Sequence, residues 1–278
     1  MEMQEKLPET VGSEGVDESV DLSRRFAAID RLYGPGAADK AEQAHVVVAG
    51  IGGVGSWTVE ALARSGVGNL TLIDLDHVSE SNINRQLHAL TTTIGASKIE
   101  AMAQRLQGVN PNCNFRLIDD FVAPENVAEI IPADADFVID ATDQLRAKVA
   151  LILDAKSKGL PLVVCGAAGG KTDSLALQKT DLAHSQNDAL LASIRQNLRR
   201  HHGYPRASNR KGQHQADNPK MGVTTLWFQQ EALRPNNNDT ESPLQGLSCA
   251  GYGSLVTVTA TMGMAAAGVA LTHVLMAA

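Results

Sequence analysis

Apolar and polar positions follow two alternating periods along the middle of the chain. Short aliphatic runs, such as residues 46–49, precede stretches in which apolar residues recur every three or four positions, such as residues 56–64. This alternation is typical of a Rossmann-like α/β fold, a doubly wound and mostly parallel sheet, here with an antiparallel extension toward the C-terminus. The expected strands lie near residues 45–50, 69–74, 114–118, 136–140, 161–166 and 175–179.

The flanking segments depart from this pattern. Residues 1–20 hold six acids and one lysine among Gly, Ser and Pro, which predicts a disordered acidic tail. Residues 21–44 are expected to form a short helical lead-in, and residues 181–247 a polar, basic and loop-rich insert. No internal repeat separates these zones, so we expect residues 21–278 to form a single domain.

The uncharged run at residues 255–278 is long enough to cross a membrane. It is rich in Ala, Gly and Thr and has no flanking Lys or Arg, which favours a buried helix that closes the core; membrane association is the alternative. The acidic N-terminus does not resemble a secretory signal. Three widely spaced cysteines, Cys113, Cys165 and Cys249, indicate a reducing compartment, so a cytoplasmic location is expected.

Charge is distributed unevenly along the chain. The 24 basic and 31 acidic residues give a net charge of −7, which argues against a general nucleic-acid binder. Between residues 195 and 220, however, seven Lys or Arg and three His accompany a single acid. Such a segment suits a polyanion, although a solvated surface loop is the plainer alternative. The candidate cations for binding a nucleic acid are Arg195, Arg199, Arg200, Arg206, Arg210, Lys211 and Lys220.

A glycine loop follows the first expected strand. Its glycines are Gly50, Gly52, Gly53 and Gly55, and a helical pattern and a second strand ending in Asp74 come next. This order is typical of a mononucleotide-binding βαβ unit, in which the loop approaches a phosphate and the acid accepts the ribose hydroxyls. Asp76 is a second candidate ligand, although it could also cap the segment that follows.

The polar segment after Asp74 argues for a nucleoside triphosphate rather than NAD or FAD. It includes Ser81, Asn82 and Arg85, and Lys98 follows at a helix start, where a cation opposes the helix dipole. Phosphate neutralisation would explain both cations, although each alone could be an ordinary surface residue. Asp143, just past the strand at residues 136–140, could hold Mg²⁺ or cap the next helix. We therefore expect ATP with Mg²⁺.

Four motifs, in this order, resemble the adenylating domain of the ubiquitin-activating superfamily, the ThiF/MoeB group. They are GIGGVG, LIDLDHVSESNINRQ, GASKIEA and IDATD, and the match runs from about residue 25 to residue 170. Flanking pieces narrow the resemblance to the tRNA threonylcarbamoyladenosine dehydratases of that group. These pieces include RLYG from Arg31, GAAGG at residues 166–170 and SCAGYGS from Ser248.

The resemblance implies an ATP-dependent cyclisation of threonylcarbamoyl adenosine in tRNA through an acyl-adenylate, with AMP and pyrophosphate as products. It also implies a homodimer in which an N-terminal arginine reaches the partner's ATP, with Arg31 as the first candidate and Arg25 as the second. The sequence leaves open a sulfur-relay protein partner and an alkali cation in the glycine-rich C-terminal loops. The implied catalytic residues are Arg85, Lys98, Asp143 and Arg31.

The chain departs from related sequences at its cysteines. It has none of the CxxC pairs that hold zinc in many superfamily members, so no zinc site is expected. The segment at residues 223–231 lacks the Cys that the dehydratases often carry there, which favours chemistry by adenylation alone. Two alternatives remain: an activator of a small ubiquitin-like or sulfur-carrier protein, which needs an acceptor Cys, and an NAD-dependent oxidoreductase, which needs a hydride-chemistry domain.

Overall fold

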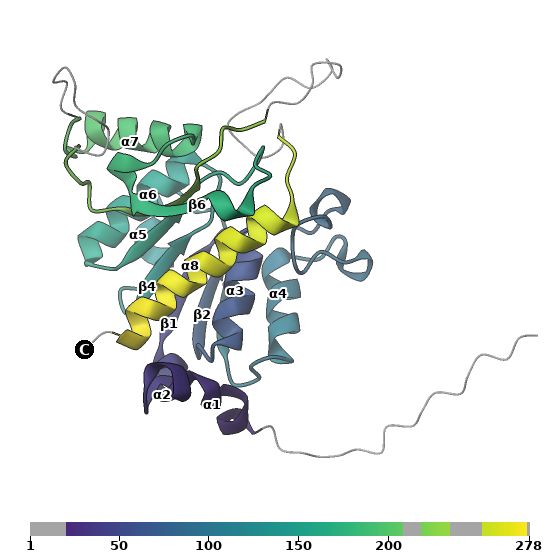
Figure 1. The fold of residues 1–278 in the computed structure, drawn as a ribbon. Coiled ribbons are helices and arrows are strands. Elements are labelled where there is room, and N and C mark those ends of the chain that lie inside the picture. The colour runs from purple at the N-terminus through teal and green to yellow at the C-terminus, as the bar shows by residue number, and fades with distance from the viewer. Residues whose placement is uncertain (1–20, 208–217, 234–251, 277–278) are drawn as a thin grey trace, which may run out of the picture.

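The computed structural model describes residues 21–207, 218–233 and 252–276 (Figure 1). The expected acidic tail at residues 1–20 lies outside these ranges, as do Arg210, Lys211 and Cys249.

A seven-stranded sheet of order β3-β2-β1-β4-β5-β7-β6 forms the centre of the molecule (Figure 1). Every neighbouring pair is parallel except β6 and β7, which are antiparallel. The predicted parallel sheet with an antiparallel extension is therefore confirmed. The strands are β1 (His45–Ala49), β2 (Asn69–Ile73), β3 (Asn114–Ile118), β4 (Phe137–Asp140), β5 (Leu162–Cys165), β6 (Leu177–Asp181) and β7 (Thr224–Phe228).

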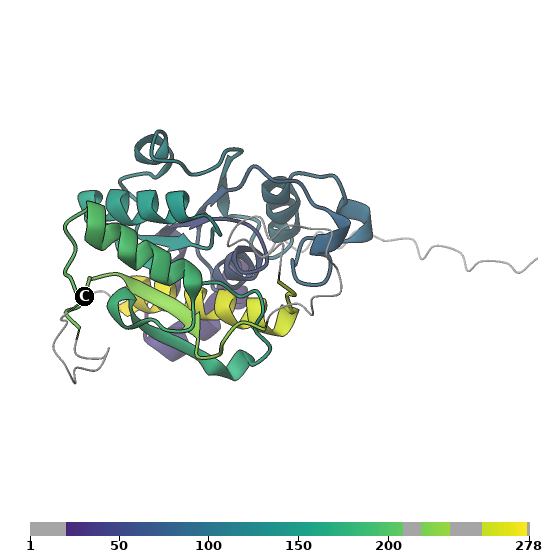
Figure 2. The same cartoon turned by 90° about the horizontal axis from the view of Figure 1, so that it is seen from above.

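Helices cover both faces of this sheet (Figure 2). Side chains alternate along each strand, so in β1 Val46 and Val48 pack with α3, α4 and α8 while Val47 and Ala49 pack with α5 and α6. Helix α7 packs against the second face beside α6. The helices are α1 (Leu22–Tyr33), α2 (Ala37–Gln43), α3 (Gly55–Arg64), α4 (Lys98–Gln107), α5 (Val127–Ile130), α6 (Leu145–Lys158), α7 (Ala189–His201) and α8 (Val256–Met276), with short 3₁₀ turns at Glu80–Asn82, Thr91–Thr93, Ser174–Ala176 and Leu182–His184.

The uncharged C-terminal segment forms α8, which runs diagonally across one face of the sheet (Figure 1). By length and hydropathy this helix could cross a membrane. Its small and apolar residues nevertheless pack in the main core: Val258, Met262, Ala266 and Ala270 are fully buried. Thr58 of α3 donates a hydrogen bond of 3.1 Å to the Gly263 carbonyl, which joins the two helices closely. The interpretation of a helix that closes the core is confirmed.

The expectation of a loop-rich segment over residues 181–247 is wrong in two places. Residues 189–201 form α7, and residues 224–228 form β7, which lies inside the sheet between β5 and β6. Helix α7 buries only a narrow stripe that includes Leu191, Ile194 and Leu198, whereas the rest of its surface is polar. Because most of the helix is polar, the three- or four-residue spacing of its buried apolar residues was not recognised in the sequence.

Candidate functional site

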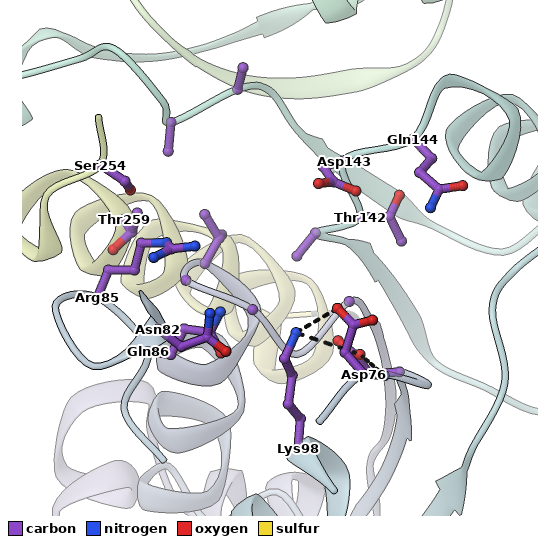
Figure 3. Close-up of a pocket in the computed structure, with 18 of the residues that line it drawn as sticks. Asp76, Asn82, Arg85, Gln86, Lys98, Thr142, Asp143, Gln144, Ser254 and Thr259 are labelled. Atoms are coloured by element: carbon purple, nitrogen blue, oxygen red, sulfur yellow. Dashed lines mark hydrogen bonds and ion pairs between the residues drawn. The ribbon is translucent and has the colours of Figure 1, made fainter. Parts of the chain in front are cut away.

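A cleft of about 800 Å³ opens at the carboxyl ends of the strands. Strands β1 and β4 are neighbours there and lead to opposite halves of the sheet, which is where doubly wound folds bind ligands. The predicted residues that line this cleft are Gly50, Gly52, Gly53, Asp74, Asp76, Ser81, Asn82, Arg85, Lys98 and Asp143. Figure 3 shows several of them pointing toward a common space.

The glycine loop turns directly beneath this space. Gly50 has a φ of +85°, and a Cβ atom there would lie 2.8 Å from the Ala141 backbone. At Gly55 a Cβ atom would lie 1.8 Å from the Gly50 carbonyl oxygen. Gly55 does not line the cleft; contrary to its predicted cofactor contact, it lets α3 begin against the loop.

Asp74 fastens the glycine loop to the end of β2. One of its carboxylate oxygens accepts the Ile51 N–H at 2.6 Å, and the other accepts the Asp76 N–H at 2.9 Å. Burial raises the pKa of the Asp74 carboxyl, an effect that the positive charge of Lys98 opposes. Asp76, whose side chain is 55% exposed, presents a more open carboxylate to the cleft than the predicted ribose ligand Asp74 does.

Lys98 is the first residue of α4, and its side chain is only 7% exposed. Its Nζ lies 2.7 Å from the Asp76 carboxylate and 3.9 Å from that of Asp74 (Figure 3). The alternative of an ordinary surface cation is therefore wrong for this lysine. The two acids hold a buried ammonium group at the cleft surface, where it can meet an anion.

Asn82 and Arg85 come from the turn that follows β2. The Asn82 side-chain oxygen accepts the Ser79 N–H at 3.1 Å, which fixes the Glu80–Asn82 turn. The Arg85 side chain donates hydrogen bonds to the Asn84 side chain, at 3.0 Å, and to the Ser81 carbonyl. The Trp57 indole donates to the backbone carbonyl of Arg85 at 3.0 Å. The fixed turn therefore aims a cation and an amide into the space that Lys98 also faces (Figure 3).

Asp143 is exposed on the turn after β4 and has no hydrogen-bond partner among the described residues. The N-cap of α6 is Gln144, without a side-chain cap, so the alternative capping role of Asp143 is not observed. Over the described ranges, no three His, Cys, Asp or Glu side chains gather to hold a metal. A cation at Asp143 would therefore take its other ligands from substrate phosphates and water, as Mg²⁺ commonly does.

A buried ion pair lies beneath this turn. Lys148 and Asp140 are completely buried, with 3.1 Å between Nζ and Oδ1, and Lys148 also donates to the Cys165 carbonyl at 2.7 Å. The same Asp140 oxygen accepts the Thr142 hydroxyl at 2.7 Å. The pair therefore ties the ends of β4 and β5 together and shapes the turn that carries Asp143.

Several lining residues had no predicted role. Gln86 is 6% exposed, and its side-chain oxygen is buried without a partner. Asp120 follows β3, so the strand-end reasoning used for Asp143 could have identified it. Ser254 lies just before α8 and belongs to the SCAGYGS piece, which carried the resemblance but gave this serine no role. Thr259 lies in the first turn of α8, and no local pattern pointed to it.

The predicted N-terminal arginines do not reach the cleft of their own chain. Both lie on α1, at the end of the sheet where the strands begin (Figure 1). Arg25 donates to the Val109 carbonyl at 2.8 Å and so anchors α1 to the domain. Arg31 is exposed.

The basic segment divides into anchoring and exposed cations. Arg195 donates to the Leu182 and Ser185 carbonyls at 3.0 Å, and Arg199 donates to the Pro205 carbonyl at 2.9 Å. Burial lowers the pKa of both guanidinium groups. These two arginines hold the protein's own backbone, contrary to the predicted tRNA contact, whereas Arg200, Arg206 and Lys220 are exposed.

The two described cysteines are not suited to nucleophilic chemistry. Cys113 is 7% exposed and Cys165 is 1% exposed. Burial raises the pKa of each thiol to about 12, which disfavours the reactive thiolate. Cys165 belongs to the main hydrophobic core.

Comparison with known proteins adds to this geometry. The ThiF family model matches residues 23–277. A tRNA threonylcarbamoyladenosine dehydratase of Haemophilus influenzae is 40% identical over 244 residues, which cover 87% of this chain and 90% of that protein. The structure of E. coli tRNA N6-threonylcarbamoyladenosine dehydratase, TcdA, in complex with ATP has a TM-score of 0.79 and 40% identity, covering 91% of this chain and 95% of that one. The AMP complex has a TM-score of 0.78 with the same identity and coverage.

Proposed function

The chain belongs to the ThiF family, and on that premise we propose that it is an ATP-dependent dehydratase of threonylcarbamoyl adenosine in tRNA. The observation that carries this proposal is the cleft, in which Lys98, Arg85 and Asn82 face a glycine loop at the carboxyl edge of the sheet. The names of the relatives and the ATP and AMP complexes of the E. coli enzyme support it.

The nucleotide would lie across the glycine loop. Gly52 and Gly53 allow the phosphates to approach the backbone, and the N-terminus of α3 favours their negative charge. Asp76 would accept the ribose hydroxyls because its carboxylate is exposed, while Asp74 keeps the loop in place. Arg85, Lys98 and Asn82, with Ser81 beside them, would hold the phosphates.

In the first step, the carboxylate of the threonyl group attacks the α-phosphorus of ATP, and pyrophosphate leaves. No general base is needed, because a carboxylic acid with an ordinary pKa of about 4 is already ionised near neutral pH. Mg²⁺ held through Asp143 would offset part of the phosphate charge. The contribution of the protein is positioning together with the fixed positive charges of Lys98 and Arg85.

In the second step, the carbamoyl group of the same nucleoside attacks the activated acyl carbon. The bond from that carbon to the phosphate oxygen breaks, AMP leaves with the former carboxylate oxygen, and the carbamoyl group loses a proton. The substrate thereby loses the elements of water and closes a ring. No thiol takes part, which agrees with the burial of Cys113 and Cys165.

The assembly belongs to the same proposal. Arg31 is exposed on the side of the domain away from its own cleft, so it would complete the site of a second copy in a homodimer. We expect the enzyme to act in the cytoplasm, where tRNA is found. An activator of a sulfur-carrier protein, or a sulfur-relay partnership, would require an accessible thiol, and the two described cysteines are buried.

Calorimetry and product analysis test this function. We expect ATP with Mg²⁺ to bind and NAD not to bind. Incubation with ATP and tRNA that carries threonylcarbamoyl adenosine should lower the mass of that nucleoside by one water, as measured by mass spectrometry of the digested tRNA. Tight NAD binding without ATP binding would contradict the proposal, as would an unchanged nucleoside.

A further inference from the structure

A second pocket, of about 420 Å³, opens at the opposite edge of the sheet from the cleft. The first residues of three strands line it: Phe137 of β4, Leu162 of β5 and Thr224 of β7. The cleft is lined instead by residues at and after the strand ends, such as Ile73 and Gly166. The two openings are therefore separated by the length of the strands.

The lining of this second pocket is positively charged. Lys156 of α6, Lys179 of β6 and His273 of α8 contribute to it, and among the residues that the structure describes no Asp or Glu does. Neither lysine forms an ion pair with an acid in the part of the chain that the structure describes. On a chain with a net charge of −7, this concentration of unneutralised cations favours an anionic ligand.

Tyr204 lines the same pocket and carries a hydroxyl group that can form a hydrogen bond. The residue is 5% exposed, and its hydroxyl is buried without a hydrogen-bond partner in the described parts of the chain. The Lys156 ammonium lies 4.3 Å from the centre of its ring, so the tyrosine also positions one of the cations. Burial raises the pKa of Tyr204, which keeps the hydroxyl protonated and able to donate. A buried unpartnered hydroxyl costs stability unless a ligand accepts its hydrogen bond.

Two helices connect the cleft with this pocket. At one end of α7, Leu190 lines the cleft, and just beyond its other end Tyr204 lines the pocket. Helix α8 makes a similar connection, because its Thr259 lines the cleft and its His273 lines the pocket. A 13-residue helix such as α7 spans about 20 Å.

Exposed cations continue the positive surface beyond the pocket. Arg206 is two residues after Tyr204, Lys220 is two residues before Gly222 of the pocket lining, and Arg200 lies in the last turn of α7. A single small anion would not need this extended surface. A polyanion would use it, because each further phosphate contact releases counterions.

We propose that the second pocket binds a backbone phosphate of the tRNA, so that the tRNA extends from the cleft along α7 to the opposite edge of the sheet. Lys156 and Lys179 neutralise the phosphate, and Tyr204 donates a hydrogen bond to one of its oxygens. This inference rests on the proposed function and adds a specific anchoring site about 20 Å from the reacting nucleotide.

Filter binding of tRNA across a range of salt concentrations tests the site. The Lys156→Gln/Lys179→Gln variant should bind at least about tenfold more weakly at low salt, and its dependence on salt should fall by roughly one phosphate contact, or about 0.7 to 0.9 in the logarithmic slope. Arg24→Gln/Arg116→Gln removes two exposed cations elsewhere on the described surface. This control should change the affinity by less than about threefold and leave the slope nearly unchanged.

Tyr204→Phe provides a test that is independent of charge. It removes only the hydroxyl and keeps the ring under Lys156. Because that hydroxyl has no partner among the described residues, thermal unfolding should stay at the wild-type temperature or rise. The affinity for tRNA should nevertheless fall by about fivefold to tenfold. An unchanged affinity in both Tyr204→Phe and the double lysine variant would overturn the proposal.

Free phosphate compounds offer the same chemical group, so a separate arm uses them as probes. Inorganic phosphate and AMP are titrated into the wild-type protein and the double lysine variant, with resonances of His273 as the reporter. Lysine-dependent binding of these probes with unchanged tRNA affinity would assign the pocket to free phosphate compounds and contradict the proposal. Lysine-dependent binding of tRNA supports it.

Turnover separates this inference from the proposed function. In the double lysine variant, KM for tRNA should rise while kcat at saturating tRNA stays within about twofold of wild type, because the reacting groups lie about 20 Å away. If the wild-type protein failed to convert modified tRNA, the proposed function would be wrong whatever the variants do. If wild type converted it and both variants had wild-type KM, the anchoring site alone would be wrong.

Discussion

Two lysine–aspartate clusters lie near the carboxyl edge of the sheet, and their surroundings differ. At the end of β2, Lys98 pairs with Asp76, which is 55% exposed and borders the cleft. At the end of β4, Lys148 pairs with Asp140, and neither side chain has any exposed surface. The first cluster opens toward a ligand, whereas the second is enclosed and joins two strands through the Cys165 carbonyl.

This difference separates binding from architecture. When the acidic partner of a buried cation is exposed to solvent, the cation can give up part of that ion pair and bind a substrate anion instead. A buried cation in an enclosed ion pair cannot do this, because loss of either residue from the pair leaves an uncompensated buried charge. We therefore expect changes at Lys98 to act mainly on catalysis and changes at Lys148 mainly on folding.

The largest effect is expected at the enclosed pair. Lys148→Met should lower the free energy of unfolding by about 3–5 kcal/mol, because Asp140 would remain buried without a counter-ion. Urea unfolding measures this loss. The double variant Lys148→Met/Asp140→Asn should recover a large share of it. Equal stability of Lys148→Met and wild type would contradict the structural role assigned to this pair.

The open cluster should respond in the opposite way. Lys98→Gln should slow AMP formation by about 10²–10³-fold, because one fixed charge near the phosphates is lost. Unfolding should change by less than at Lys148, since the exposed Asp76 can be hydrated. Arg64→Gln, which removes an exposed cation from a pair within α3, is the matched control and should keep normal turnover. Normal turnover of Lys98→Gln would remove this lysine from the proposed chemistry.

A third prediction concerns His88, which is buried near Lys98 and has no hydrogen bond from either ring nitrogen to a described residue. Burial lowers the pKa of His88 to about 4, with a smaller contribution from Lys98. The unfolded chain therefore takes up a proton first as pH falls through about 6.5, and stability present at neutral pH is lost toward pH 4, by up to about 3 kcal/mol.

His88→Leu should remove this loss, so the difference between the two proteins should vary with pH across this window. The raised pKa of Asp74 acts in the opposite direction, but it is present in both proteins. Chemical unfolding at intervals between pH 4 and pH 7.5 measures the difference. A difference that is constant across these pH values would show that His88 is not held neutral.

The last prediction tests whether the open region is completed by a second copy, and its expected signal, the activity regained on mixing, is the smallest of the four. Arg31→Ala and Asp143→Ala subunits should each be inactive alone. Mixed and re-equilibrated, they should regain up to one working site per mixed dimer, because one subunit keeps Asp143 and the other keeps Arg31. Sedimentation measures assembly in parallel. An active monomer, or no recovery in confirmed mixed dimers, would contradict completion of the site by Arg31.

Sequence patterns predicted the open region better than the enclosed one. The glycine loop, Asp74, Arg85 and Lys98 belong to sequence motifs whose spacing fixes their positions in the fold. Ten of the residues that line the cleft could therefore be identified from the sequence. The ion pair between Lys148 and Asp140 belongs to no such motif. In the sequence Lys148 looks like any lysine of a helix, and only the packing of α6 against the sheet brings it to Asp140.

The basic segment was predicted less well for the same reason. Charge alone could not separate Arg195, which holds the Leu182 and Ser185 carbonyls, from the exposed Arg200. Strand β7 lay in a segment expected to be loop because its neighbours in the sheet, β5 and β6, are distant in sequence. Hydrophobic periodicity describes a single segment of the chain, whereas these contacts form between different segments.

The most direct test of the central claim is AMP release from ATP in the presence of two matched tRNAs, one carrying threonylcarbamoyl adenosine and one carrying unmodified adenosine at the same position. One AMP should be released for each modified tRNA that closes its ring, and no AMP above background should be released with the unmodified tRNA. Equal AMP release with both tRNAs, or none with either, would contradict a cleft that adenylates the carboxylate of this nucleoside.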